Sequence, residues 1–194
     1  HFGYQLTFFR RAISGEENTN HPSAWNSNQI YLAHFAITDT QEGQHYLTDQ
    51  IARNANNLSG TKVDPYFSIW LHDWEISQVA DDVFLMQAKD DQIEIDFRLE
   101  NIKNVVLHGE NGLSQKGEGL GNASYYFSQT RLETEGKLRI ENEWYEVSGL
   151  SWMDHEFGTS TLGDEQVGWE WFSIQLDNQS EIMLFQIRND NVTI

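Results

Sequence analysis

The sequence predicts an all-β protein built as a barrel or a sandwich. Hydrophobic and polar residues alternate with a period of two along much of the 194-residue chain. The predicted strands are short and closely spaced turn signals separate them, a pattern typical of β-barrels and β-sandwiches. Aromatic residues form 13% of the chain, and their large rings suit strands and pocket walls. A barrel of about eight strands can enclose one small ligand.

The N-terminal half is predicted to contain five strands. They cover residues 1–10, 30–38, 66–77, 83–89 and 92–101. In the first strand, Phe2, Tyr4, Leu6 and Phe8 share one face. Residues 21–28 predict a loop, and residues 49–61 predict a short helix or a long loop. The steps at 80–82 and 90–91 read as hairpin turns.

The C-terminal half repeats the pattern with five more strands. They cover residues 123–129, 132–140, 144–154, 168–176 and 181–188, with turns expected at 135–136, 141–143 and 177–179. Residues 109–121 are rich in Gly and predict a linker, so we expect a domain boundary there. Phe172–Leu176 echoes Phe67–Leu71, as two related β units would.

The composition limits the classes of partner. The net charge is −18 with only 12 Lys and Arg, so nucleic acid is not an expected partner. No apolar run reaches membrane-spanning length, which argues against membrane insertion. The absence of Cys excludes disulfides and thiolate chemistry. The chain begins at His1 and ends at Ile194 inside strand-like patterns, so we expect a fragment whose targeting segment lies outside it.

The stretch Ser151–Phe157 carries three ionisable residues among aromatic ones. Because neighbours in a strand point to opposite faces, Asp154 and Glu156 should share a face with Trp152, and His155 should face away. A carboxyl group among rings can act as a general acid, and the ring faces can stabilise a cation. The alternative is a structural Asp154 that accepts backbone N–H groups or pairs with Arg131 or Arg188.

Other kinds of chemistry find little support in the residues. The seven His residues show no ligand spacing, so no metal site is expected. No G-x-S-x-G elbow suggests a serine nucleophile, and no phosphate loop suggests a nucleotide, so no cofactor is expected. Trp169 and Trp171 share a face, where they line a ligand cavity or close a barrel floor beneath Arg188.

Several motifs together resemble the AttH-like family, the lipocalin-like group related to carotenoid 1,2-hydratase. They run in order through nearly the whole chain: F2-G-Y-Q-L-T-F-F-R10, Y31-L-A-H-F-A-I-T-D39, L113-S-Q-K-G117 with G121-N-A-S-Y-Y-F-S128, W152-M-D-H-E156 and G168-W-E-W-F-S-I-Q-L176. The resemblance implies two tandem lipocalin-like (calycin) β-barrels, both incomplete in this chain. We place the first at 1–112, without its first strand, and the start of the second at 113–194.

The resemblance also implies a function. In the hydratase branch an acidic residue protonates a carotenoid end group, and Asp154 matches that position, with Trp152 where that branch carries Tyr. No counterpart of the hydratase's upstream His is evident, since the region offers Ser124, Tyr125 and Tyr126. The AttH-like branch implies lipid or isoprenoid handling in the periplasm or at the bacterial cell envelope, alongside transport components.

Two main functions follow as expectations. The first is binding or processing of an apolar lipid or isoprenoid, and the alternative is an acid-catalysed hydratase or isomerase that uses Asp154 and Glu156. A third, purely architectural or partner-binding role stays open. The expected ligand-binding residues are Tyr4, Phe8, Tyr126, Trp152, Trp169 and Trp171.

Overall fold

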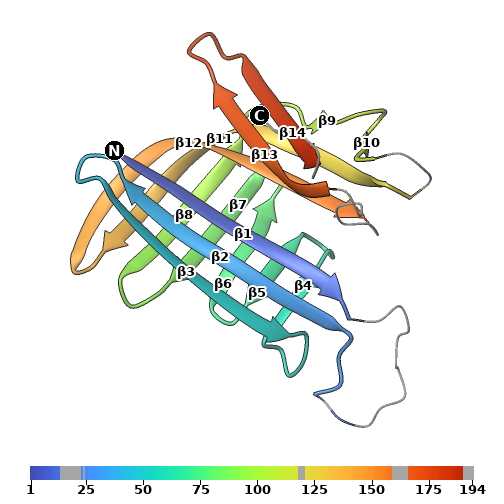
Figure 1. Ribbon diagram of the computed structural model, residues 1–194. Coiled ribbons are helices and arrows are strands. Elements are labelled where there is room, and N and C mark those ends of the chain that lie inside the picture. Colours follow the sequence, from blue (N-terminus) through green and yellow to red (C-terminus); the bar gives the residue numbers. More distant parts are fainter. Residues whose placement is uncertain (14–22, 24, 118–120, 159–165, 190–194) are drawn as a thin grey trace. The chain divides into compact units, whose positions relative to one another are not determined.

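The computed structural model describes residues 1–13, 23, 25–117, 121–158 and 166–189, and the regular structure in these ranges is β-strand (Figure 1). The strands are β1 (Phe2–Ala12), β2 (Gln29–Asp39), β3 (Gln44–Arg53), β4 (Ser59–Lys62), β5 (Ser68–Leu71), β6 (Trp74–Ala80), β7 (Val83–Lys89), β8 (Ile93–Asn101), β9 (Val106–Leu107), β10 (Leu113–Gln115), β11 (Ala123–Ile140), β12 (Glu143–Gly158), β13 (Gln166–Gln175) and β14 (Glu181–Asn189). The all-β prediction is confirmed. No helix that could cross a membrane occurs among the described residues.

The chain forms two compact units. Unit 1 comprises His1–Glu100 and Thr134–Gly149, and unit 2 comprises Asn101–Glu133 and Leu150–Ile194. The units interleave along the sequence, whereas the predicted barrels, 1–112 and 113–194, are contiguous. The division into two tandem barrels stays a prediction.

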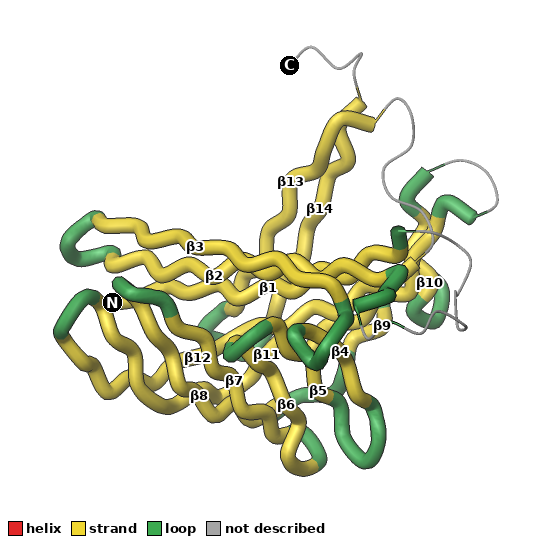
Figure 2. The backbone as a smooth tube through the Cα atoms, turned by 90° about the horizontal axis from the view of Figure 1, so that it is seen from below, coloured by secondary structure: helices red, strands yellow, loops and turns green. Residues whose placement is uncertain are grey.

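Unit 1 contains two antiparallel sheets whose apolar faces meet. One consists of β1, β2 and β3, and the other runs from β4 through β8. Figure 2 shows the first sheet lying across the strands of the second. Phe35 and Trp74 are fully buried between them, with ring centroids 5.7 Å apart. Tyr4 contributes a second ring contact, 5.0 Å from Phe97. This burial of large rings is the main stabilising term for the unit.

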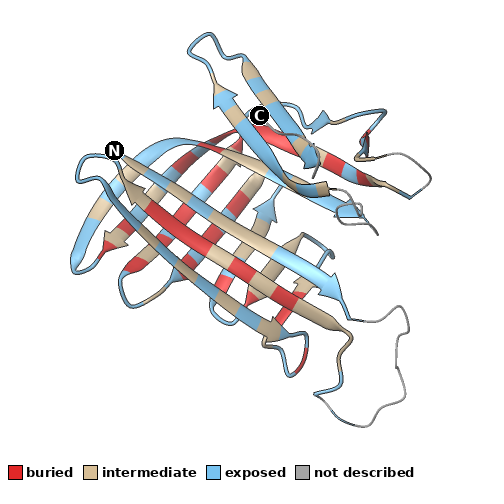
Figure 3. Ribbon diagram, in the orientation of Figure 1, coloured by how far each residue is buried: buried red, intermediate tan, exposed pale blue. Residues whose placement is uncertain are grey.

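Alternation explains which strand faces are buried. In β2, Tyr31, Ala33, Phe35 and Ile37 are buried, and in β8 the buried set is Ile93, Ile95, Phe97 and Leu99. Figure 3 shows bands coloured as buried along both strands. The strands predicted at 30–38, 83–89 and 92–101 are therefore confirmed, because a strand with one buried face shows the period of two.

Two N-terminal predictions were wrong. Residues 44–53 form strand β3, which overlaps the stretch 49–61 that was expected to be a short helix or a long loop. The side chains of β3 are exposed or half-buried, so its sequence lacks a strong apolar face. The single strand expected at 66–77 is split into β5 and β6 by a turn in which His72 has φ of 54°.

Strand β11 corrects a prediction in the C-terminal half. Residues 123–140 form one strand where two strands and a turn at 135–136 were expected. Gly136 stays in the strand with φ of 148°, and a Cβ there would lie 2.1 Å from the carbonyl oxygen of Asp96. This glycine permits close approach of two backbones and makes no turn.

The remaining turns agree with the sequence. Asp82, Glu141 and Gln179 adopt positive φ in the hairpin turns expected at 80–82, 141–143 and 177–179. At 90–91 the Asp90 carboxylate accepts the backbone N–H of Gln92. The linker predicted at 109–121 contains the short strand β10, and residues 118–120 lie outside the described residues. Residues 21, 22 and 24 of the loop predicted at 21–28 also lie outside the described residues.

Candidate functional site

The site lies in unit 2, where two strands present facing rows of polar side chains. On β11 the row is Ser124, Tyr126 and Ser128, all buried. On β12, which pairs with β11, the row is Trp152, Asp154 and Glu156. Because every second residue of a strand points the same way, each strand supplies its whole row to one face.

The Asp154 carboxylate is held by three side-chain donors. Its Oδ1 accepts the hydroxyl of Tyr126 at 2.9 Å, the hydroxyl of Ser128 at 2.5 Å and the indole N–H of Trp152 at 3.0 Å. None of the hydrogen bonds among the described residues uses Oδ2, and Asp154 is exposed. The carboxylate is therefore fixed through one oxygen and presents the other outward.

Tyr126 joins this carboxylate to the third strand of the site. Its hydroxyl donates to Asp154 and accepts the indole N–H of Trp171, on β13, at 3.1 Å. Burial, together with the neighbouring Asp154 charge, raises the pKa of Tyr126 well above its usual value. The phenol therefore keeps its proton and acts as a donor.

A histidine reaches the same carboxylate through a serine. Nε2 of His108, which directly follows β9, lies 2.6 Å from Oγ of Ser128, and the His108 ring packs on Tyr126 at a centroid distance of 4.2 Å. Burial lowers the pKa of His108, and Lys116 adds to this effect while Asp154 and Glu156 oppose it. The imidazole is therefore neutral at neutral pH.

Glu156 has different partners from Asp154. Its Oε1 accepts the Ser124 hydroxyl at 2.5 Å and lies 2.8 Å from Lys116 Nζ. The same ammonium group lies over the rings of Tyr126 and Phe185, at 4.9 and 4.7 Å. Asp154 and Glu156 share a face as predicted, but among the described residues a cation pairs with Glu156 and none pairs with Asp154.

His155 faces away from the two carboxylates, as alternation predicts. Its ring packs against Phe127 at 5.0 Å and Phe157 at 5.5 Å. Burial lowers the pKa of His155. The run Asp154-His155-Glu156 is therefore not a triad.

If Asp154 had a structural role, the sequence predicted backbone N–H groups, Arg131 or Arg188 as its partners. This prediction of partners was wrong. Arg131 pairs with Glu181 at 2.7 Å, and Arg188 lies 3.9 Å from Glu170. No backbone N–H or guanidinium of the described residues bonds to Asp154, whose partners are hydroxyl groups and an indole. Among the described residues, the ion pair of Arg188 is with Glu170, and no ring contact of Trp169 or Trp171 with Arg188 supports a plug.

The expected ligand-binding residues fall into two groups. Tyr126, Trp152 and Trp171 gather around Asp154, and the rings of Trp152 and Trp171 meet edge to face at 6.3 Å. Tyr4 and Phe8 belong to unit 1. Trp169, on the same face of β13 as Trp171, is 60% exposed. Three of the six residues therefore form one site.

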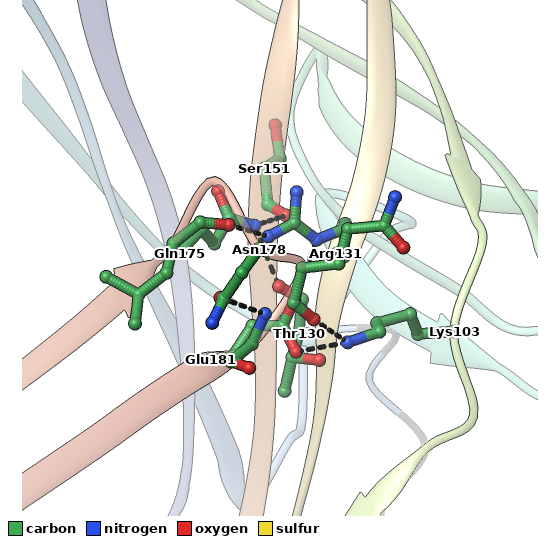
Figure 4. A network of polar contacts seen from close by, with 10 residues as sticks. Lys103, Thr130, Arg131, Ser151, Gln175, Asn178 and Glu181 are labelled. Atoms are coloured by element: carbon green, nitrogen blue, oxygen red, sulfur yellow. Dashed lines mark hydrogen bonds and ion pairs between the residues drawn. The ribbon is translucent and has the colours of Figure 1, made fainter.

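A buried ionic network fastens the β13–β14 hairpin that carries Trp171. Glu181 accepts from Arg131 at 2.7 Å and pairs with Lys103 at 2.6 Å, and Lys103 also bonds to the Gln179 carbonyl. Gln175 donates to the carbonyls of Thr130 and Ser151 at 2.7 and 3.0 Å (Figure 4). These bonds tie both strands of the hairpin to β11 and β12, which positions Trp171.

The cavity of unit 1 and metal ligation by the described residues add nothing to this site. A cavity of about 290 Å³ is lined by Lys137, Trp144, Tyr145 and Glu146, which belong to unit 1 and include none of the expected ligand-binding residues. In the described part of the chain, no group of three or more His, Asp or Glu residues is placed to hold a metal ion.

Four residues of the site were not expected from the sequence. They are His108, Lys116, Ser128 and Ser124, which was noted only as standing in place of a histidine. His108 directly precedes the stretch 109–121 that was predicted to be a linker, and nothing in its spacing points to Asp154. The one available signal was the alternation of β11, which puts Ser124 and Ser128 on the face of Tyr126.

Comparison with known proteins supports the resemblance seen in the sequence. The AttH-like family model matches residues 1–193. A crystal structure described as an AttH from Nitrosomonas europaea is 31% identical, with a TM-score of 0.84, and the match covers 98% of this chain and 56% of that one. Kievitone hydratase from Nectria haematococca is 16% identical, with a TM-score of 0.57 and coverage of 84% and 53%. A search of curated proteins gave no match. This chain thus spans about half the length of both solved relatives.

Proposed function

This chain belongs to the AttH-like family and has its lipocalin-like fold, and from that premise we propose that it binds an apolar lipid or isoprenoid and processes it by acid–base chemistry at Asp154. The similarity to kievitone hydratase concerns the fold alone. The argument for chemistry depends on the residues of the site.

One observation carries the proposal: Asp154 Oδ1 is held by three donors while Oδ2 has no hydrogen bond among the described residues. A general acid or base must be held within reach of the reacting atom. Three donors on one oxygen fix the plane of the carboxyl group, and the free oxygen then has a defined direction toward a bound molecule.

The reaction assigned to this site is the addition of water to a carbon–carbon double bond. The Asp154 carboxyl proton forms a C–H bond to one alkene carbon as the π bond breaks, and the other carbon becomes a cation. Water forms a C–O bond to that cation and returns a proton to the carboxylate. One water supplies both added groups, so the step needs no oxidant or cofactor.

The aromatic residues suit the charge that develops. A cation near the face of a Trp ring is stabilised by about 0.5–2 kcal/mol or more, depending on desolvation. Trp152 and Trp171 meet edge to face beside Asp154, and their N–H groups are used by Asp154 and Tyr126. These hydrogen bonds are made at the edges of both rings, so they hold the rings in place and leave the apolar ring faces unused.

Binding without turnover is the second candidate. Glu156, the other carboxyl group of the row, is paired with Lys116 at 2.8 Å. This ion pair argues against a mechanism in which both Asp154 and Glu156 act as acid or base. A carrier would need only the aromatic surface. On the family resemblance we place either activity at the bacterial cell envelope, with envelope transport components as partners and without nucleic acid or membrane insertion.

The test has two stages. Protein purified from its own host is extracted and examined by native mass spectrometry, where we expect a bound apolar molecule. The protein is then incubated with an acyclic carotenoid, such as neurosporene, in detergent micelles and oxygen-18-labelled water. Hydration places one labelled oxygen in each product molecule.

Variants assign the role of Asp154. Asp154→Asn keeps the shape of the side chain and is expected to lose about a hundredfold or more of the turnover, as for loss of a general acid. The matched control is Asp177→Asn, an exposed turn residue, which should retain wild-type turnover. A bound lipid without oxygen-18 incorporation by the wild type would favour the carrier, and full activity of Asp154→Asn would exclude Asp154 as the acid.

A further inference from the structure

Strand β3 is an edge of the first sheet of unit 1. The strand order is β1, β2, β3, and β3 pairs with β2 in one regular register without a bulge (Figure 1). Edge strands are commonly protected by Lys, Pro, bulges or a very short length. β3 is ten residues long and contains neither Lys nor Pro. Its edge is therefore a template on which another strand can pair.

The backbone bonds show which residues of β3 face this edge. The N–H of Asn54 donates to the carbonyl of Gln29 at 3.1 Å and continues the β2–β3 register by one residue. Hydrogen-bonded and non-hydrogen-bonded positions alternate along an antiparallel pair. The even-numbered residues of β3 therefore bond to β2, and the odd-numbered residues direct their N–H and C=O groups away from it. No backbone hydrogen bond among the described residues uses the outward N–H of Asp49, Ile51 or Arg53.

The same residues carry their side chains on the outer face of the sheet. Ile51 is 63% exposed and continues a cross-strand row with Leu32 on β2 and Phe9 on β1. Asp49 and Arg53 flank Ile51 and are both exposed, and neither belongs to an ion pair among the described residues. The edge thus presents a negative charge, an apolar side chain and a positive charge at successive outward positions.

We propose that β3 pairs antiparallel with β3 of a second copy of this chain, about a two-fold axis at Ile51. Antiparallel pairing reverses the order of the three side chains in the partner. Ile51 then lies opposite Ile51 of the partner subunit, and Asp49 lies opposite Arg53 of the partner subunit. Cross-strand pairs of opposite charge and of β-branched residues stabilise a sheet. The contact uses the same patch on both copies, so it closes as a dimer. It does not depend on any chemistry at Asp154.

The charges also select this register over neighbouring ones. An axis at Asp49 would set two carboxylates opposite each other, and an axis at Arg53 would set two guanidinium groups opposite each other. Like charges directly opposite destabilise a sheet. An axis at Leu47 would place Ile51 opposite Gly43 of the partner subunit, where no side chain meets it. The axis at Ile51 alone among these four joins opposite charges on both sides of an apolar pair.

The first test uses cross-linking, which is specific here because the chain contains no Cys. In Ile51→Cys the two thiols lie opposite each other, with Cα atoms about 5.5 Å apart, so a short thiol cross-linker should give a covalent dimer. Leu47→Cys is the matched control, with a similarly exposed side chain on the same face. In the proposed register Leu47 lies opposite Ala55 of the partner subunit. The two Leu47 positions are then about 27 Å apart, at about 3.4 Å per residue.

The yield of covalent dimer should be at least about tenfold higher for Ile51→Cys than for Leu47→Cys. Equal yields, a higher yield for Leu47→Cys, or no dimer from either variant would overturn the pairing. Circular dichroism checks that both variants are folded, as expected for exposed positions.

The second test uses charge reversal and analytical ultracentrifugation. Asp49→Lys and Arg53→Glu each set like charges opposite each other and should raise the dissociation constant of the dimer at least about tenfold. The double variant restores opposite charges and should return to within about threefold of the wild type. Asp81→Lys, in an exposed turn of unit 1, changes the net charge as Asp49→Lys does and should not weaken the dimer.

Rescue by the double variant separates the pairing from an effect of net charge or of folding. A wild type that stays monomeric up to about 1 mM, where weak complexes form, would overturn the proposal. So would a double variant that dimerises no better than the single ones, or assembly that continues beyond the dimer.

Discussion

At the scale of single residues, the Asp154 cluster follows strand alternation on β11 and β12, and two of its members, His108 and Lys116, lie outside the strands. Strand alternation alone predicts that Asp154, Glu156 and Trp152 share one face and that His155 lies on the other. The same rule, applied to β11, puts Tyr126 on one face with Ser124 and Ser128, although these two serines were not predicted as site residues. His108 could not be predicted in this way, because it lies 2.6 Å from Ser128 through tertiary folding across 20 sequence positions, and no local pattern encodes that contact.

Tyr126→Phe tests the cluster directly. The change removes a buried hydroxyl that donates to Asp154 and accepts from Trp171, so we expect a loss of about 1–2 kcal/mol in the free energy of unfolding. The adjacent Tyr125 is 55% exposed on the opposite face and stacks on Phe157, a contact that Phe would keep. Tyr125→Phe is therefore the control, with little expected change. Equal urea midpoints for both variants would show that the Tyr126 hydroxyl contributes nothing to stability.

At the scale of elements, the β13–β14 hairpin depends on a charged anchor. Burial alone would raise the pKa of Glu181, but hydrogen bonds from Lys103 and Arg131 outweigh it and lower the pKa. A carboxyl group with a lowered folded-state pKa stabilises the fold above its ordinary pKa, and that contribution is lost as the pH falls through the lowered value. Acid should therefore loosen this hairpin.

The measurement compares urea midpoints of the wild type and Glu181→Gln at neutral pH and at a pH below the ordinary range of glutamate. We expect the variant to be less stable at neutral pH by about 3 kcal/mol, since Arg131 is left buried without its charge partner. It should also lose part of the acid dependence. Glu170→Gln is the control on the same hairpin, because its ion pair with Arg188 is half exposed. A wild-type acid dependence in Glu181→Gln would contradict the anchor.

Strand β11 shows how a sequence signal can be misread at the scale of elements. Glu135-Gly136 resembles a turn, yet the strand continues through it because the missing Cβ of Gly136 leaves room for the Asp96 carbonyl. Strand β3 was missed for the converse reason, since its side chains show no strongly buried face. Both errors come from packing partners that the local sequence does not contain.

Gly136→Ala is expected to destabilise unit 1. A Cβ would lie 2.1 Å from the Asp96 carbonyl oxygen and 3.0 Å from Phe97 Cα, so two backbones would have to separate, at a cost of about 1–3 kcal/mol or more. Gly149→Ala is the matched control, because nothing lies within 4 Å of its added Cβ. Thermal unfolding of both variants checks this. A Gly136→Ala protein as stable as Gly149→Ala would place the two strands farther apart than described.

At the scale of the whole molecule, the sequence predicted the class and the family better than the organisation. Alternating strands established the all-β class, and the motifs from Phe2 to Leu176 indicated the AttH-like family. The Gly-rich stretch at 109–121 suggested a boundary between two domains, each made of one continuous segment. Contacts between residues far apart in sequence instead determine the compact units. The Arg139–Glu94 ion pair, at 3.1 Å, is one such contact that joins the second segment of unit 1 to the first.

The interleaved units also have a consequence for genetic exchange. Any contiguous piece of the gene that encodes one complete unit also encodes part of the other, because the chain passes between them after Glu100, Glu133 and Gly149. A single recombination crossover between two related genes would therefore bring together a unit 1 from two parents or a unit 2 from two parents. Hybrids with one crossover should keep their fold only when pairs such as Arg139 with Glu94, and Gly136 with its close neighbour Asp96, are inherited in compatible forms.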